Sequence, residues 1–136
     1  MHSIKDLMLP EKTCEFEYPE IQGFKLQLTY LSNKQIQDIT NKSMTKKYSK
    51  ITKTYHSELN DSTYTKNLIP RIIKGWSGLT VSGLAKLVLV DYNDEMADEE
   101  IEYTEDNAIE LCEQSVDFTN WVVSMSRDLE NFSKTS

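Results

Sequence analysis

The chain has 136 residues, of which 38% are hydrophobic and 27% are charged, and its formal net charge is −7. This size and composition are typical of one globular domain. The longest apolar run, at residues 87–90, is far shorter than the roughly 20 residues of a membrane-spanning helix, so we expect no membrane partner.

Charge is unevenly distributed along the chain. Up to Val90 there are 13 Lys and Arg against 8 Asp and Glu, whereas from Asp91 onward there are 2 against 14. Such asymmetry is typical of an interaction surface or of a solvated acidic face. The acidic half argues against nucleic acid as the main partner, because it repels phosphate.

Without an apolar signal region at the N-terminus, the protein is expected to stay in the cytoplasm, with Cys14 and Cys112 as free thiols.

The N-terminal part predicts a β-hairpin. Residues 1–12 are expected to form a flexible arm, whose short apolar patch at residues 4–9 suits either one helical turn or a loose segment that docks on a partner. Beyond it, apolar and polar residues alternate on both sides of the turn at residues 19–23, which is typical of two paired strands. The apolar positions are Cys14, Phe16, Tyr18, Phe24, Leu26, Leu28 and Tyr30. This apolar face needs a cover, because an isolated hairpin is only marginally stable.

The middle of the chain predicts two helices separated by a polar segment. Ser32 and Gln35 fit a capping box, which predicts a helix lying over the hairpin. Residues 45–60 are rich in Lys, Thr and Tyr and have no clear period, so we expect a mobile basic loop or weak strands. Their Lys and Tyr residues are also typical of nucleic-acid binding through phosphate contacts and base stacking. A solvated loop is the favoured interpretation.

Asp61 or Ser62 is expected to cap a core helix whose apolar residues run from Leu68 to Trp76 at helical spacing. Pro70 implies that this helix either begins near Ile69 or bends there. Gly75 or Gly78 is expected to end it, and a short helix entered through Ser82 follows.

The last part of the chain predicts an acidic loop and two helices. Residues 91–102 lack the glycine and the alternating ligands of a calcium loop, so we expect a solvated loop. Thr104 is expected to cap the first helix, and Ser115 or Asp117 to begin the second. The second helix has an apolar stripe at helical spacing, formed by Phe118, Trp121, Val122, Met125, Leu129 and Phe132.

Together these elements predict a single α+β domain over residues 1–136, mainly α-helical, with an N-terminal β-hairpin packed under several short helices. We expect no catalytic, cofactor-binding or metal-binding residues and therefore a protein that is not an enzyme. Both histidines, His2 and His56, fall in segments expected to be mobile, whereas a nucleophilic site needs rigid positioning.

The aromatic residues allow two interpretations. Trp76 and the apolar stripe can pack internally, which is the commoner role of such residues, or they can contact a partner. The candidate partner-binding residues are Trp76, Phe118, Trp121, Met125, Leu129 and Phe132.

Three landmarks suggest a family. They are Phe16-Glu17-Tyr18-Pro19 near the start, Gly75-Trp76-Ser77-Gly78-Leu79 in the middle and Asp128-Leu129-Glu130-Asn131-Phe132 near the end. Their order resembles that of the tail assembly chaperones of long-tailed bacteriophages.

The resemblance implies a viral protein of the host cell cytoplasm that binds the phage tape measure protein and keeps it soluble during tail assembly. The tail tube protein and a second copy of the chain are further candidate partners. A structural minor tail or tail-completion protein of the virion is the alternative function, and a host-directed adaptor is a third.

Overall fold

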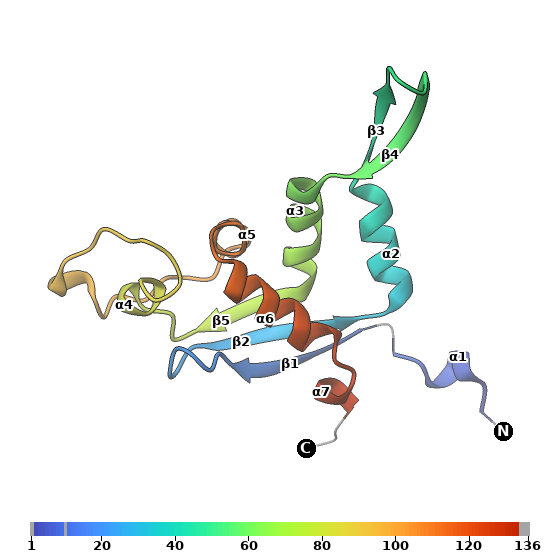
Figure 1. Cartoon of the computed structure of the whole chain (residues 1–136). Coiled ribbons are helices and arrows are strands. Elements are labelled where there is room, and N and C mark those ends of the chain that lie inside the picture. The colour runs from blue at the N-terminus through green and yellow to red at the C-terminus, as the bar shows by residue number, and fades with distance from the viewer. Residues whose placement is uncertain (1, 10, 134–136) are drawn as a thin grey trace.

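The computed structural model describes residues 2–9 and 11–133, so Met1 and Pro10 of the expected flexible arm lie outside it. A three-stranded antiparallel sheet has helices over one of its faces, and a separate two-stranded hairpin projects away from it (Figure 1). This arrangement confirms the α+β class and the N-terminal hairpin under several helices. In the described part of the chain, no helix is long and apolar enough to cross a membrane.

The sheet is built on the predicted hairpin. β1 (Glu11–Glu17) pairs with β2 (Lys25–Leu31), and β5 (Ile73–Ser77) pairs with the other side of β2. Phe16 lies opposite Leu26 on the face that the helices cover, whereas Thr13 lies opposite Thr29 on the other face, with their hydroxyls 2.7 Å apart. Since Glu11 pairs with Leu31, the end of the expected arm belongs to β1 instead.

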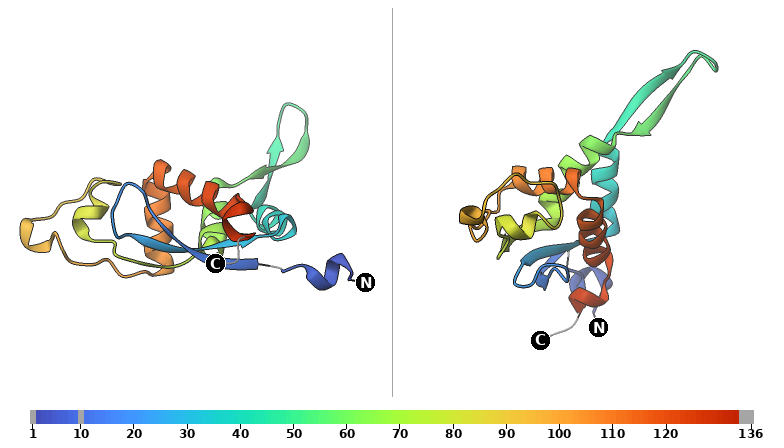
Figure 2. Two further views of the ribbon diagram at one scale, coloured as in Figure 1. Left: turned by 90° about the horizontal axis from the view of Figure 1, so that it is seen from below. Right: turned by 60° about the vertical axis from the view of Figure 1, so that its left-hand side comes forward.

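Four helices cover most of the apolar face of the sheet. α2 (Asn33–Lys42), α3 (Asp61–Ile72) and α6 (Val116–Arg127) pack on β2, and α5 (Glu105–Gln114) packs on α3 and α6. The shorter elements are α1 (Ile4–Leu7), α4 (Val81–Leu84), a 3₁₀ turn at Asp94–Met96, and α7 (Glu130–Ser133). Figure 1 and the left view of Figure 2 show that the N-terminal segment and the segment from α4 to the 3₁₀ turn extend from opposite ends of this body.

Three predicted helix starts are confirmed by their caps. The Ser32 hydroxyl accepts a hydrogen bond from the Gln35 amide, and the Gln35 side chain accepts one from the Ser32 amide. Thr104 caps α5, and Ser115 caps α6.

Two predicted caps are wrong by one or two residues. α3 is capped by Asn60, whose side chain accepts from the Thr63 amide at 3.0 Å, rather than by Asp61 or Ser62. The Asn60 amide also donates to the Ser43 carbonyl. This bond holds Asn60 in place, so the cap lies one residue earlier than expected. The cap of α4 is Thr80, whereas the sequence predicted that this helix would start at Ser82.

The core helix ends earlier than the sequence pattern predicts. α3 runs from Asp61 to Ile72, so it does not begin near Ile69, and Pro70 lies in its last turn. The chain then enters β5, where Trp76 pairs with Leu26 of β2. Helical spacing is therefore a wrong guide beyond Ile72, because the chain there pairs with β2 instead of continuing the helix.

The predicted last helix is interrupted. α6 ends at Arg127, and α7 begins at Glu130. The Asp128 carboxylate accepts from the Glu130 amide at 3.1 Å, and a side chain that bonds the backbone two residues onward favours a turn over a helix. The apolar stripe therefore continues across two helices, with Leu129 in the break.

The segment at residues 45–60 forms strands, the second of the two alternatives considered. β3 (Met44–Ser49) and β4 (Thr54–Leu59) make an antiparallel pair that we call the basic hairpin (residues 44–59). Thr and Tyr favour strands, and the rings of Tyr48 and Tyr55 lie 5.1 Å apart across the pair.

Aromatic packing joins the sheet to the last helices. The rings of Phe24 and Phe118 stack with centroids 6.0 Å apart, and both side chains are completely buried. The Tyr18 ring lies 5.5 Å from Phe118. Burying a large apolar side chain is worth about 1.5–3 kcal/mol, so this cluster holds the hairpin turn against α6.

The hairpin turn also contacts the end of β5 through two glycines. Gly78 has a φ of +78°, and a Cβ placed on it would collide with the backbone carbonyl of Gly23. A side chain is therefore excluded at Gly78 by conformation and by space. At Gly75, a Cβ would meet only the flexible end of the Gln27 side chain.

These two glycines make a matched pair for stability measurements. Gly78→Ala should lower the free energy of unfolding by more than about 2 kcal/mol, because the backbones must separate or strain. Gly75→Ala should cost less than about 1 kcal/mol, because the Gln27 side chain can rotate away. Chemical denaturation of both variants checks this, and equal losses would contradict the proposed backbone contact.

The buried Cys112 thiol makes stability dependent on pH. Burial raises the pKa of this thiol from 9.0 to about 11, although a hydrogen bond with the Thr119 side chain opposes the rise. The unfolded chain thus loses this proton at a lower pH than the folded chain. The free energy of unfolding should fall as pH rises from 9.0 to about 11, by up to about 1.4 kcal/mol per pH unit. In Cys112→Ala this dependence should be shallower, and identical slopes for both proteins would contradict it.

Candidate partner-binding surfaces

The six candidate partner-binding residues fall into two groups. Phe118 and Phe132 are 0% and 3% exposed, and Phe132 packs edge-on against Phe16 with ring centroids 5.4 Å apart. In this conformation both belong to the core, as the internal-packing interpretation of the stripe requires. Trp76, Trp121, Met125 and Leu129 keep accessible surface.

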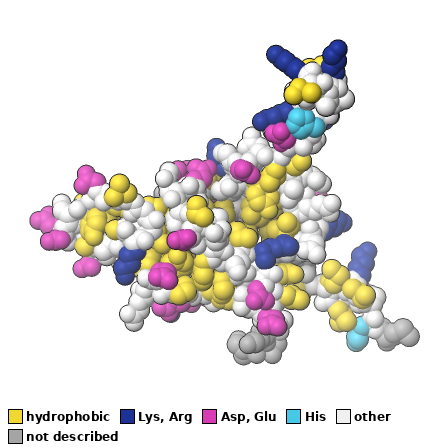
Figure 3. All heavy atoms as spheres, in the orientation of Figure 1, with side chains coloured by type: hydrophobic (Ala, Val, Ile, Leu, Met, Phe, Trp, Pro, Cys, Tyr) yellow, Lys and Arg dark blue, Asp and Glu magenta, His cyan; other side chains and the backbone are white. Residues whose placement is uncertain are grey.

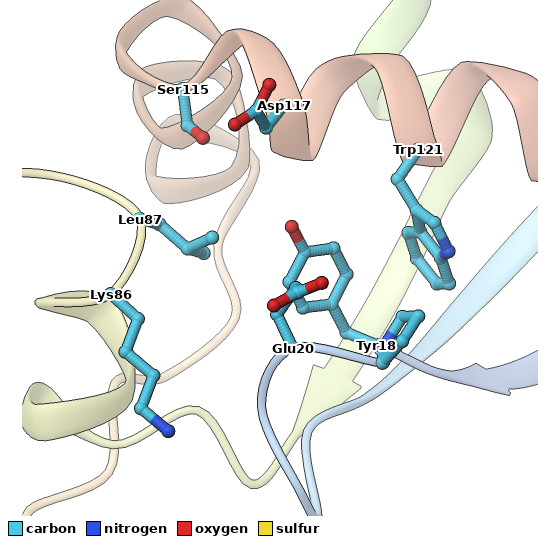
Figure 4. A pocket seen from close by; sticks show the side chains of 8 residues that line it. Tyr18, Glu20, Lys86, Leu87, Ser115, Asp117 and Trp121 are labelled. Atoms are coloured by element: carbon cyan, nitrogen blue, oxygen red, sulfur yellow. The ribbon is translucent and has the colours of Figure 1, made fainter.

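Trp121 lines a hollow between the hairpin turn, α4 and α6 that we call the aromatic pocket. It has a volume of about 760 Å³, and its wall includes Tyr18, Leu87 and the carboxylates of Glu20 and Asp117. Tyr18 and Trp121 meet edge-on with centroids 4.9 Å apart. In Figure 4 the Tyr18 hydroxyl points toward the start of α6, while the Lys86 ammonium points away from Asp117.

The lining of the aromatic pocket carries two carboxylates, Glu20 and Asp117, and one ammonium group, Lys86. Burial, followed by the charges of Glu20 and Asp117, raises the pKa of Tyr18. Among residues 2–9 and 11–133, ion pairs form only at Glu58, so neither pocket carboxylate is neutralised by one. Aromatic rings with free carboxylates suit a cationic group of a partner.

Trp76 occupies a different surface. Its indole N–H donates to the Ile101 carbonyl at 2.9 Å, and the Tyr103 hydroxyl donates to the Ile73 carbonyl at 2.6 Å. The two rings meet edge-on, 5.2 Å apart. Burial, with a smaller contribution from Glu105, raises the pKa of Tyr103. These contacts fix residues 101–103 against β5.

Beside this pair lies a shallow apolar hollow of about 140 Å³, which we call the Trp76 groove. Its lining is almost wholly apolar and includes Trp76, Leu79, Leu84, Val88, Ile101 and Leu111. The segment of residues 91–102 (the acidic loop) leads directly into it at Ile101.

Leu129 lines a third surface, the terminal groove, together with Met8, Leu9 and Tyr30. Its volume is about 740 Å³, and a smaller hollow lined by Leu7, Leu9 and Leu129 adjoins it. Leu7, Met8, Leu9 and Leu129 are each about 60–70% exposed. Apolar surface from both ends of the described chain therefore lies together, and residues 2–9 and 11–133 leave it uncovered.

Sequence reasoning missed the partners of these residues rather than the residues themselves. It assigned Tyr18 and Tyr30 to a strand face and the residues around Leu9 to a flexible arm. It had no signal that Tyr18 would meet Trp121 or that Leu9 and Leu129 would line one groove, because both depend on how distant elements pack. Met125 is half-buried, and its backbone carbonyl accepts from the Asn131 side chain at 3.0 Å.

In the described residues, no three His, Cys, Asp or Glu side chains lie together as metal ligands would. The lowered pKa of Glu58 comes from hydrogen bonds with His56 and Lys47 on the exposed basic hairpin.

Tyr103→Phe tests the contact that positions the Trp76 groove. Loss of the hydroxyl leaves the Ile73 carbonyl without this donor and should lower the free energy of unfolding by about 1–3 kcal/mol. Tyr92→Phe is the control, because the Tyr92 side chain is 38% exposed. Denaturant unfolding should leave the control unchanged, and two equally stable variants would show that the contact contributes nothing.

Comparison with known proteins places the chain in a family. A family model described as YdaY prophage protein matches residues 31–136, from the end of β2 to the C-terminal residue. No curated protein and no solved structure matches the chain. The match spans 106 of the 136 residues, which is more than three quarters of the sequence. The chain therefore belongs to the YdaY prophage protein family and is a phage-derived protein.

Proposed function

We propose that this prophage protein is a tail assembly chaperone that binds the tape measure protein and keeps it soluble until the tail tube forms. The terminal groove is the observation that carries the proposal. Leu9 and Leu129 remain 69% and 58% exposed although they lie beside a well-packed core. An apolar groove of this kind suits one face of an amphipathic helix, which is the form expected of a long helical client.

The charge of the protein supports the same role. A net charge of −7 favours solubility, which a chaperone needs while it carries an apolar client. The terminal groove itself contains Lys5 and Lys34 at its rim. These lysines suit acidic residues that flank the apolar face of a client helix.

The aromatic pocket is a second contact of the same proposed interface. Trp121 and Met125 belong to the half-buried side of α6, and their replacement by polar residues is expected to weaken client binding. We propose that binding is reversible and involves no catalysis or cofactor, because the client must be released to the growing tail.

The test is co-expression with the tape measure protein of the same prophage, followed by measurement of the soluble, co-purifying client. The wild-type chain should keep the client soluble. Leu9→Glu with Leu129→Glu should reduce the co-purified client at least about tenfold, because carboxylates are costly in an apolar contact. The control is Leu89→Glu, which changes an equally apolar and fully exposed residue away from the terminal groove and should retain full activity.

The outcomes separate the possibilities. If the groove variant protects the client as well as the wild type does, the client binds elsewhere on the molecule. If the wild-type chain neither protects nor binds the client, the chaperone function is wrong. Retention of the chain in purified phage particles would then favour the alternative, a minor tail or tail-completion protein.

A further inference from the structure

The basic hairpin lacks the packing that normally stabilises a pair of strands. Every residue of β4 is exposed, and in β3 only Ser49 is half-buried. Its apolar side chains face solvent as well, since Ile51 is 96% and Tyr55 73% exposed. A two-stranded ribbon with open edges is marginal in water and readily pairs with another surface.

The direction of the basic hairpin is fixed at its base. Ser43 is completely buried, and its hydroxyl donates to the Ile39 carbonyl at 2.8 Å. The Asn67 side chain donates to the same hydroxyl at 3.1 Å, and the Asn60 amide donates to the Ser43 carbonyl at 2.9 Å. These bonds join the end of α2 to the start of α3, so the hairpin leaves the body at a defined point.

The hairpin is cationic. It contains Lys46, Lys47, Lys50 and Lys53 but only one acid, Glu58, giving a net charge of +3 with His56 neutral. Glu58 is already occupied, because Lys47 lies 3.0 Å from it and His56 2.8 Å. In Figure 3 the lysines gather at the far end of this projection.

A complementary surface lies at another end of the molecule. The acidic loop contains seven Asp and Glu and no Lys or Arg between residues 91 and 102. Ion pairs in the described ranges, 2–9 and 11–133, do not involve any of these acids. The loop is anchored rather than free, because the Val81 amide donates to the Glu99 carbonyl and the Ile101 amide to the Leu79 carbonyl.

The surface beside the acidic loop also has apolar residues that can contact the exposed apolar side chains of the basic hairpin. The Trp76 groove adjoins the acidic loop at Ile101 and presents Leu84 and Val88 to solvent. The same surface therefore combines apolar area with free carboxylates, as the hairpin combines apolar area with lysines.

The two surfaces cannot meet within one chain in this conformation. Figures 1 and 2 show the basic hairpin projecting beyond α2 and α3, away from the segment that carries α4 and the acidic loop. A contact between them therefore requires another molecule. We propose that the basic hairpin of one copy docks on the acidic loop and the adjoining Trp76 groove of a second copy. Reciprocal docking closes a dimer, whereas one-way docking builds rings or longer assemblies.

This self-association is independent of the proposed client site. Opposite charges attract and orient the copies, and Ile51, Tyr48 and Tyr55 supply the apolar contact. The association should weaken as ionic strength rises, because exposed charge pairs are screened by salt.

A charge-exchange experiment with the full-length chain tests the contact. One variant carries Lys46→Glu, Lys50→Glu and Lys53→Glu, which leaves the pair of Lys47 and Glu58 intact. The other carries Asp94→Lys, Glu95→Lys, Asp98→Lys, Glu99→Lys and Glu100→Lys, all at exposed positions, which changes the charge of the acidic loop from −7 to +3. Their masses and dissociation constants are measured by light scattering and analytical ultracentrifugation, and circular dichroism checks that each folds.

The wild type should self-associate, and each variant alone should do so at least about a hundredfold more weakly, because like charges then face each other. A mixture of the two variants should associate again, since each hairpin then faces a loop of opposite charge. Ile51→Ser with Tyr55→Ser, which leaves the charges unchanged, should also weaken self-association and serves as a second test if a charge variant does not fold.

Three results would overturn the proposal. The wild type could be monomeric at its highest soluble concentration, the charge variants could associate as strongly as the wild type, or their mixture could fail to associate. A monomeric wild type whose hairpin lysines instead bind a single-stranded oligonucleotide would identify the hairpin as a nucleic-acid contact.

Discussion

The structure depends on covering one face of a small sheet. A three-stranded antiparallel sheet buries enough surface only if something packs on its apolar side, and here the stacked rings of Phe24 and Phe118 provide that contact. Phe24 follows the hairpin turn, and Phe118 lies in the first turn of α6. The contact therefore joins segments from nearly opposite ends of the chain and places α6 across β2.

The positions of the candidate surfaces follow from this contact. With α6 held across β2, Trp121 faces the hairpin turn, and the chain after Arg127 turns back toward β1. The aromatic pocket and the terminal groove are the two places where α6 and its continuation do not fill the space beside the sheet. The Trp76 groove depends instead on the hydrogen bonds of Trp76 and Tyr103.

Local chemistry explains which parts of the fold could be predicted from the sequence. Alternation identified β1 and β2, and Ser32, Thr104 and Ser115 identified three helix starts, because each signal acts within a few residues. The Trp76 strand and the break at Asp128 could not be predicted, since strand pairing and a turn overrode helical spacing there. Of the candidate site residues, the pattern found the accessible Trp121 and Leu129 but could not separate them from the buried Phe118 and Phe132.

The two proposals use different parts of the charge distribution. The proposed client site lies where apolar residues from both termini meet, with lysines at the rim. The proposed contact between copies uses the separation of positive and negative charge that was visible in the sequence. The two interactions could therefore occur on one molecule at the same time.

The hydrogen bond between Asn60 and Ser43 has a consequence for how this fold can diversify. Because these residues are already joined at 2.9 Å, the chain between them leaves and re-enters the body at a single closed point. The length and composition of the interval between them can therefore change without disturbing the sheet or the helices over it. Natural selection can therefore exchange that ribbon as an independent module while the buried framework stays the same.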